Sequence, residues 1–536
     1  MSTDKIITLV AFAFYMVLMI LIGVFYSRKT KNNEDYFLGG RNLGGWTAAL
    51  SAQASDMSGW LLMGLPGSIY LAGSGKMWIA IGLLIGTILN WYLVSSRLRK
   101  YTIVADNSLT IPSFFQNRYR DKTGVIKIVA AIIIAIFFAV YTASAFSAGA
   151  NLFAVLFGDS IDNAYTVGLI IAAVVILVYT LLGGFKAVCT TDFIQGMLML
   201  VAILAVPIVA YMMLTWNQGF AEALLGHKIP NFDGAVNNIS DPLSYISLFR
   251  DGEGNPVGAT DIISGLAWGL GYFGMPHIII RFMAIKSEAE VKKSRKIAIV
   301  WVILSLTAAC FVGLVARGAL DKVLFSVAPG ADGQLVADNK SQTVFIELIR
   351  QIFSGNGILI FIGGIFLCGI LAAIMSTADS QLLVTSSAIS EDMYKGVIKK
   401  DASEKKALMV GRIAVIIVAV IAFFIALDPN SSVMDLVSDA WGGFGSAFGP
   451  VVLLALFWKR STLAGAISGM ITGTVFTLVW SYIPINGAVL GDSTGIYSLA
   501  IGFPLALFVN FVVSLISKKP SKEMIKEFES IKKVEI

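Results

Sequence analysis

Apolar residues dominate this chain in runs of about 20, which is the length that crosses the hydrocarbon core of a bilayer as an α-helix. Short polar segments separate the runs. We mark thirteen apolar runs along the 536 residues: 6–26, 44–72, 77–96, 125–157, 164–182, 188–214, 260–280, 297–316, 357–389, 409–427, 437–457, 462–483 and 494–516. The pattern predicts an all-α polytopic membrane protein with thirteen transmembrane helices.

The second run contains polar residues at its centre. Asp56 lies midway along it and is followed by Ser58 and Gly59. A carboxylate at the centre of a membrane helix costs about 2.5–3.5 kcal/mol on insertion scales, and glycine is a poor helix former. We therefore expect a break in the helix near Asp56–Gly59. Broken backbone at this depth must face protein or a water-filled cavity, which is typical of a solute and ion site.

The seventh run, 260–280, carries a second set of helix-breaking residues. These are Gly265, Gly269, Gly271, Gly274 and Pro276. The two interrupted runs are five spans apart, so a second copy of a five-helix unit would enter from the opposite face of the membrane. Paired interrupted spans of this kind are typical of inverted-repeat transporters, whose site lies near the midplane. The fold class predicted is thus a five-plus-five inverted-repeat core with two broken helices.

This topology divides the chain into segments. The predicted segments are 1–43 (an accessory helix and an inside loop), 44–214 (first repeat), 215–259 (outside loop), 260–458 (second repeat), 459–516 (two accessory helices) and 517–536 (cytoplasmic tail). We expect the charged tail to be solvated. The pattern of 344–353 predicts a short amphipathic helix on the outer surface.

A third polar segment lies midway along run 357–389. Ala373, Ser376 and Thr377 are spaced i, i+3 and i+4, so they share one helix face. Hydroxyls in membrane helices often bond their own i−4 carbonyls or join neighbouring helices, and that alternative stays open. At the depth of Asp56, however, two hydroxyls and the carbonyls of a broken helix would offer the oxygen ligands that sodium prefers.

Composition and charge narrow the class further. Hydrophobic residues make up 57% and charged residues 14%, and the mean hydropathy is +0.79. The net charge of +6 does not indicate nucleic-acid binding, because the cations lie in loops. Lys and Arg gather in alternate loops, which predicts an outside N-terminus and an inside C-terminus. Neither a metal-ligand cluster nor a catalytic nucleophile–base set is visible, so we expect no enzyme and no obligate protein partner.

Five long segments resemble the sodium/solute symporter family, and within it the bacterial members that carry proline. The segments are Ser51–Gly67, Gly183–Gln195, Gly271–Ala284, Met375–Thr377 and Trp458–Gly469. The resemblance covers nearly the full length. It implies sodium-coupled uptake of L-proline across the bacterial cytoplasmic membrane by alternating access.

The resemblance also implies roles for single residues. Sodium, as the co-transported ion, would be held by the backbone carbonyls of Ala54, Met57 and Ala373 and the hydroxyls of Ser376 and Thr377. The substrate would be bound by Ser58, Gly59 and Trp60 from the first broken helix and by Trp268, Tyr272 and Pro276 from the second. Asp56 would organise the break, Asp192 would lie on the ion's release path, and Arg41 would act in coupling. Asp379 receives no role.

The chemistry of proline suits this assignment. Helix N-termini favour a carboxylate, and aromatic faces favour an apolar ring and an ammonium group. Three alternatives remain. The same scaffold could couple transport to protons, it could carry another small organic solute, or it could be a proline-binding membrane sensor.

Overall fold

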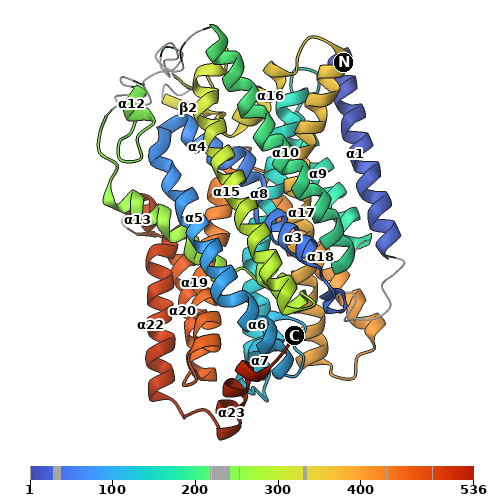
Figure 1. Cartoon of the computed structure of the whole chain (residues 1–536), viewed down its shortest axis with the longest axis vertical. Helices are drawn as coiled ribbons and strands as arrows, with labels where there is room; N and C mark the ends of the chain where they lie inside the picture. Colours follow the sequence, from blue (N-terminus) through green and yellow to red (C-terminus); the bar gives the residue numbers. More distant parts are fainter. Residues whose placement is uncertain are drawn as a thin grey trace.

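The computed structural model describes residues 2–27, 38–182, 184–217, 219, 222, 239, 242–252, 254–329, 335–429, 431–485 and 487–536. Within these ranges the protein is nearly all helical (Figure 1). Eleven helices are long and apolar enough to cross a membrane, or twelve if a bent pair is counted as one span. The predicted thirteen is not reached, because this count joins parts of runs 44–72 and 77–96 in one segment, Trp60–Val104.

The first half of the chain supplies one flanking helix and the first broken helix with its neighbours. Its helices are α1 (Thr3–Ser27), η1 (Gly39–Arg41), α3 (Gly45–Asp56), η2 (Trp60–Gly64), α4 (Leu65–Ala72), η3 (Gly73–Lys76), α5 (Met77–Leu89), η4 (Asn90–Val94), α6 (Ser95–Val104), α7 (Ile111–Tyr119), α8 (Val125–Phe157), α9 (Ala164–Leu182) and α10 (Phe185–Asn217).

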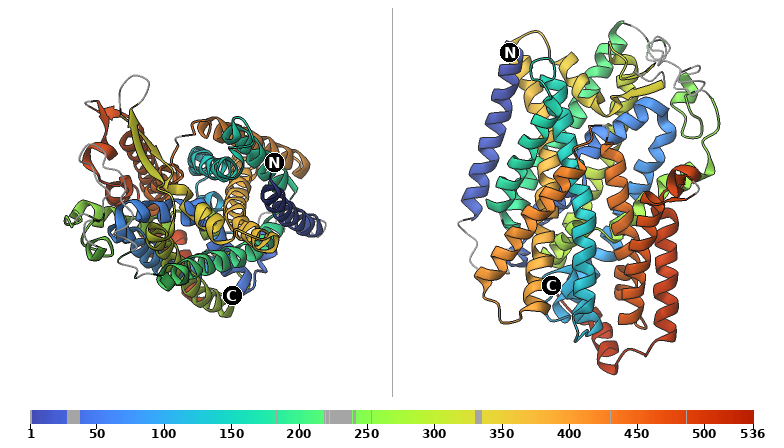
Figure 2. Two further views of the ribbon diagram at one scale, coloured as in Figure 1. Left: turned by 90° about the horizontal axis from the view of Figure 1, so that it is seen from above. Right: turned by 180° about the vertical axis from the view of Figure 1, so that it is seen from behind.

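The second half begins with the short helix α12 and then the second broken helix. Its helices are α12 (Pro242–Tyr245), α13 (Ala259–Ala267), η5 (Trp268–Phe273), α14 (Pro276–Ala284), α15 (Glu288–Ala319), η6 (Ser341–Thr343), α16 (Val344–Ile352), α17 (Gly357–Ser387), η7 (Ala388–Ile398), α18 (Glu404–Ile425), α19 (Val433–Phe457), α20 (Leu463–Tyr482), α21 (Leu490–Thr494), α22 (Ser498–Ile516), α23 (Lys522–Ser530) and η8 (Ile531–Lys533). Helices α1 and α22 lie on opposite sides of the bundle (Figure 2).

Both predicted breaks are present. Helix α3 ends at Asp56, and Met57 leaves the helix with φ −88° and ψ 79° before the chain turns back into η2. In the second case α13 and α14 are bent by 43°. This break falls at Gly274 and Met275, since the glycine-rich stretch before it stays in a 3₁₀ helix, η5.

The glycines of α13 and η5 also allow close packing against α5. A Cβ on Gly86 would lie 2.2 Å from the Gly269 carbonyl oxygen, and one on Gly82 would lie 2.4 Å from that of Gly265. Such distances are far inside van der Waals contact. Only glycine fits at these positions, so the outer half of the second broken helix packs backbone against backbone on α5.

Two outer elements differ from expectation in detail. The predicted helix at 344–353 is confirmed as α16, but its residues Val344–Ile349 are buried, so it packs into the bundle instead of lying on its surface. Before it, β1 (Phe325–Pro329) pairs antiparallel with β2 (Leu335–Asn339), a hairpin that was not predicted. Residues 330–334, between the two strands, lie outside the described residues.

The expectation of a solvated tail is wrong. Helix α23 docks on the end of the bundle that α6 and α7 form, where Arg120 donates to Glu523 (2.8 Å) and Glu527 (3.1 Å). The Phe528 ring receives the guanidinium groups of Arg97 (5.2 Å) and Arg118 (5.3 Å). The ion pairs and the aromatic ring of α23 lie on the same side of the helix. This side covers apolar surface of α6 and α7.

We expect Phe528→Ala to loosen this docking. The lost cation–π contacts are worth about 1 kcal/mol, which raises the undocked fraction about fivefold. Tryptic cleavage at Lys522 and Lys526, timed in detergent, should accelerate accordingly. Phe508→Ala, which changes a ring that is 64% exposed on α22, serves as the control and should leave the cleavage rate unchanged. Equal rates in wild type and Phe528→Ala would contradict the docking.

Candidate functional site

Two hydroxyls of α17 meet the last turn of α3. Ser376 Oγ donates to the Ala54 carbonyl at 2.8 Å, and Thr377 Oγ1 lies 3.4 Å from the same oxygen. Ser376 Oγ is also 2.7 Å from the Ala372 carbonyl and 3.3 Å from that of Ala373. Ser376 Oγ is therefore within hydrogen-bond distance both of its own i−4 carbonyl, that of Ala372, and of the Ala54 carbonyl on α3. Four of the five predicted ion ligands come together at one buried point: Ala54, Ala373, Ser376 and Thr377.

Met57, the fifth predicted ligand, is the first residue beyond α3. Its N–H donates to the Gln53 carbonyl (2.9 Å), and its thioether accepts from Ser305 (3.5 Å). Because the backbone leaves the helix here, the carbonyls of this last turn lose their regular i+4 donors. In the described ranges no group of three His, Cys, Asp or Glu could hold a metal ion, so any cation at this point would rely on neutral oxygens.

Asp56 ties the two broken helices together. Its side chain is fully buried, and Tyr272 of η5 donates to its Oδ2 at 2.6 Å. The Asp56 carbonyl, freed at the helix end, accepts from Trp60 Nε1 (3.2 Å) and from Tyr141 of α8 (3.3 Å). Asp56 Oδ1 is buried without a hydrogen-bond partner. This carboxylate thus fixes the break and keeps one oxygen available.

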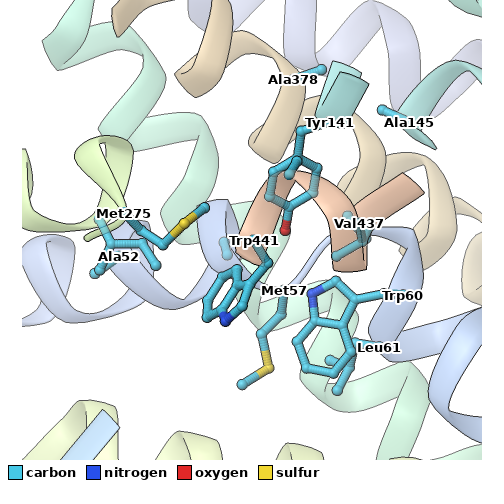
Figure 3. Close-up of a cluster of buried hydrophobic side chains, with 14 of the residues drawn as sticks. Ala52, Met57, Trp60, Leu61, Tyr141, Ala145, Met275, Ala378, Val437 and Trp441 are labelled. Atoms are coloured by element: carbon cyan, nitrogen blue, oxygen red, sulfur yellow. The ribbon is translucent and has the colours of Figure 1, made fainter. Parts of the chain in front are cut away.

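The predicted substrate residues fall into two groups. Trp60 and Ser58 lie at the first break, and the Ser58 hydroxyl is buried without a partner. Figure 3 shows the Tyr141 hydroxyl directed between the rings of Trp60 and Trp441, with Met57 below. Tyr272 packs edge-on against Trp441 at 5.0 Å. These side chains pack together at the first break, with aromatic rings beside the polar groups of Asp56 and Ser58.

The other predicted substrate residues lie at the margins of this cluster. Gly59 packs on α8, where an added Cβ would lie 2.9 Å from the Ala148 Cβ. Trp268 stacks on Tyr497 at 5.0 Å, and its carbonyl accepts from Trp441 Nε1 at 2.8 Å. Pro276 is the first residue of α14, where its missing N–H costs nothing. Trp268 is therefore separated from the Asp56 region by the Trp441 ring.

Asp192 lies in a buried ionic network, which the sequence reading missed. Arg281 of α14 contacts Asp192 Oδ2 at 3.2 Å, and both side chains are at most 1% exposed. Ser51 of α3 donates to the same Oδ2 at 2.6 Å and accepts from Arg281 Nε at 3.1 Å. Arg281 also donates to the Ser380 hydroxyl and the His277 carbonyl. One guanidinium thereby joins α3, α10, α14 and α17.

Asp379 belongs to this network. Ser380 donates to Asp379 Oδ1 at 3.3 Å, and Asp379 is fully buried. Asp192 contacts the Arg281 guanidinium directly, and Asp379 is linked to it through Ser380. The signal that could have revealed Arg281 was its place in an apolar segment, since a lone charge there requires a partner. The His277 ring packs edge-on against Phe138 and Tyr141.

Arg41 is buried at the inner end, away from these groups. It has a left-handed backbone conformation (φ 52°) and follows two glycines that also have positive φ. Its guanidinium donates to Thr102 Oγ1 (3.1 Å) and to the carbonyls of Met283 (3.0 Å) and Ser108 (2.7 Å). Arg41 thus fastens the entry to α3 onto α6 and onto the end of α14.

Comparison with known proteins places this geometry in a family. The profile described as "Sodium:solute symporter family" matches residues 36–473. The osmoregulated proline transporter OpuE of Bacillus subtilis (strain 168) is 42% identical over 534 residues, which cover 100% of this chain and 99% of OpuE. The chain belongs to the sodium:solute symporter family. The sodium/proline symporter of Staphylococcus aureus (strain USA300) is also 42% identical, over 96% of this chain and 93% of that protein.

A solved structure shares the fold of this family member. It is a sodium-coupled sialic acid symporter in a substrate-bound, outward-open state, with a TM-score of 0.68. The alignment covers 96% of this chain and 98% of the other, at 18% identity. At that identity the likeness concerns the arrangement of helices alone.

Proposed function

We propose that this symporter takes up L-proline together with sodium across the cytoplasmic membrane by alternating access. The observation that carries the proposal is the meeting of the Ser376 and Thr377 hydroxyls with the Ala54 carbonyl, beside a broken helix. Two relatives of 42% identity, named as proline transporters over nearly the whole chain, support the choice of substrate.

The proposal includes thirteen spans, a five-plus-five inverted-repeat core, an outside N-terminus and an inside C-terminus. The two observed breaks support the paired repeats. The amino terminus lies at one end of the long axis and the carboxyl terminus toward the other, as an odd number of crossings requires (Figures 1 and 2). The segments are those expected from the sequence, with a docked instead of a solvated tail.

In this proposal sodium binds between α3 and α17. The carbonyls of Ala54, Met57 and Ala373 and the two hydroxyls supply five oxygens without a formal charge, and Asp56 supplies negative charge nearby. Ion binding would hold α3 against α17 and so order the break. Asp192, with Arg281, would then line the ion's exit towards the inside, and Arg41 would transmit the movement of α3 to α6 and α14.

Proline would bind beside the ion, between the two broken helices. Its secondary ammonium would face Asp56 and Ser58, its ring would lie among Trp60, Tyr272 and Trp441, and Gly59 and Pro276 would shape the two helix ends. Trp268 would close the region from outside. Each complete transport cycle would then carry one net positive charge inward.

The driving force suffices for accumulation. A single charge moved across about 100 mV contributes roughly 2.3 kcal/mol. A tenfold sodium gradient adds about 1.4 kcal/mol, and the sum corresponds to several hundredfold accumulation of a neutral zwitterion. Purified protein in liposomes should therefore concentrate radiolabelled proline when an inward sodium gradient is imposed. Uptake that is unchanged without sodium, or that follows only a proton gradient, would refute sodium coupling.

The ion site can be tested apart from the substrate. In Ser376→Ala/Thr377→Ala two of the five oxygens are lost, and contacts to charged groups are worth about 1.5–3 kcal/mol each. The sodium concentration for half-maximal uptake should rise at least about 100-fold, while uptake at saturating sodium persists. Thr385→Ala/Ser387→Ala removes two hydroxyls of α17 that bond only local carbonyls, at 2.8 Å each, and should leave the sodium dependence unchanged.

A further inference from the structure

A cavity of about 640 Å³ borders the site described above at Trp268 and is otherwise lined by residues outside that site. It is enclosed by the N-terminal ends of α5, α13 and α19, by the end of α20, and by the segment that leads into α22. Helix α13 lies over the N-terminal end of α22 (Figure 1). Trp268 is one of the residues that line the cavity, and the cavity opens to the surface.

Its walls carry an excess of negative charge. Four carboxylates line it, those of Asp261, Asp435, Asp439 and Asp492, against one cation, Lys76. Lys76 is already paired with Asp261 at 3.4 Å. Asp435, Asp439 and Asp492 have no ion pair within the described ranges. Asp435 and Asp439 are one turn apart on α19, where like charges repel, and Asp435 lies in the first turn, where the helix N-terminus favours a carboxylate.

Aromatic rings form the rest of the lining. Trp78, Trp268, Trp480 and Tyr497 all border the cavity. Trp78 Nε1 donates to the Leu248 carbonyl (2.9 Å) and Trp480 Nε1 to that of Ile496 (3.0 Å). Trp268 and Tyr497 are stacked at 5.0 Å. Because both indole N–H groups donate to backbone carbonyls, the rings of Trp78 and Trp480 are held in place and present their carbon surfaces to the cavity.

A buried polar group in the lining also has no partner. Ser498, at the start of α22, is 3% exposed, and its Oγ makes no hydrogen bond to any described residue. Its Oγ lies against α19, 2.6 Å from the place that a Cβ on Gly442 would take, so it faces the wall and not the open space. Charge and aromatic surface are thus found around a single space.

We propose that this cavity is a binding site for an organic ammonium cation. Carboxylates beside aromatic rings are the combination that recognises alkylated ammonium groups, because the rings attract the cation and accept its carbon surface. A small inorganic cation would use the carboxylates alone. An anion would be repelled by the three carboxylates that have no ion pair within the described ranges. The proposal does not depend on the transported solute or on the coupling ion.

The test uses cysteine chemistry in the full-length protein, without transport. Ser438→Cys and Ser481→Cys each place a thiol in the lining. The native thiols, Cys189, Cys310 and Cys368, are buried, and wild-type protein measures their background. Each variant is treated with a trimethylammonium-ethyl or a sulfonatoethyl methanethiosulfonate, and modification is followed by mass spectrometry. Rates are divided by those of a free thiol in solution.

We expect the cationic reagent to be favoured by about 30-fold, within the range by which charged clefts concentrate counter-ions. Adding Asp435→Asn/Asp439→Asn should reduce this preference to a few-fold, while Asp162→Asn, an exposed carboxylate outside the lining, should leave it unchanged. Tetramethylammonium should slow the cationic reagent more than sodium does at equal ionic strength, and Trp480→Ala should abolish that difference.

Three results would overturn the proposal. Equal protection by sodium and tetramethylammonium would show an inorganic cation site. A normalised preference near unity would show that the carboxylates do not act on the cavity. Failure of both cysteines to react, in protein whose circular dichroism spectrum matches wild type, would show that the cavity does not admit ligands.

Discussion

Asp56→Asn should abolish sodium-driven accumulation of proline. Asparagine keeps the size of the side chain and an oxygen for the Tyr272 hydroxyl, which lies 2.6 Å from the carboxylate, but it removes the charge. The proposed ion ligands are all neutral, so the buried carboxylate next to them is the main source of compensating charge at the break. Unit charges about 5 Å apart interact by roughly 3 kcal/mol at an effective dielectric constant of 20, which is more than 100-fold in affinity.

Two measurements separate this charge effect from a structural one. Uptake into liposomes at rising sodium gives the transport defect, and the thermal unfolding temperature in detergent gives stability. Tyr272→Phe is the matched variant, since it removes the donor and leaves the carboxylate, and we expect it to reduce uptake by only about tenfold. Sodium dependence of Asp56→Asn that matched wild type would exclude the role given to this charge.

Arg281→Gln should be the most destabilising of the single changes considered. It leaves Asp192 and Asp379 buried without their guanidinium, and breaking a buried pair from one side costs about 3–5 kcal/mol. Asp192→Asn should be less severe, because Asp379 still retains its link to Arg281 through Ser380. The double variant Asp192→Asn/Arg281→Gln should recover part of the unfolding temperature lost in Arg281→Gln, since fewer unpaired charges remain.

A second buried arginine provides the control. Arg317 is fully buried on α15, where its guanidinium lies 5.5 Å from the Tyr70 ring. Arg317→Gln should also lower the unfolding temperature, but Asp192→Asn should not restore it. Unfolding temperatures of the three single and two double variants check the pairing directly. Independent, additive effects of Asp192→Asn and Arg281→Gln would contradict the network.

The helix breaks and the hydroxyl pair could be predicted because their causes are local. Polar residues and glycine directly follow Asp56, and the spacing of Ser376 and Thr377 sets their common face whatever the helix packs against. That this face meets Ala54 followed from the family resemblance. The glycines of the seventh run were interpreted only as breakers, although two of the four, Gly265 and Gly269, permit contact with α5.

What the sequence could not provide was the register between distant helices. The link between Arg281 and Asp192 depends on α14 and α10 being level to within one turn, and no local pattern encodes that. The docking of α23 depends on Arg97, Arg118 and Arg120 facing the tail. From the sequence, these arginines were interpreted as ordinary cations of an inside loop. The family resemblance grouped Trp268 with Tyr272, whereas Trp441, which is remote in sequence, separates them.

The glycine contact between α5 and the outer half of the second broken helix restricts how the protein can move. Carbonyl oxygens of Gly265 and Gly269 occupy the space that methyl groups would need on Gly82 and Gly86, so the two backbones are in direct contact. We expect this contact to keep the two segments together as one body. Spin labels on their exposed faces should therefore keep a constant separation throughout the transport cycle and provide an internal ruler against which the other helices can be measured.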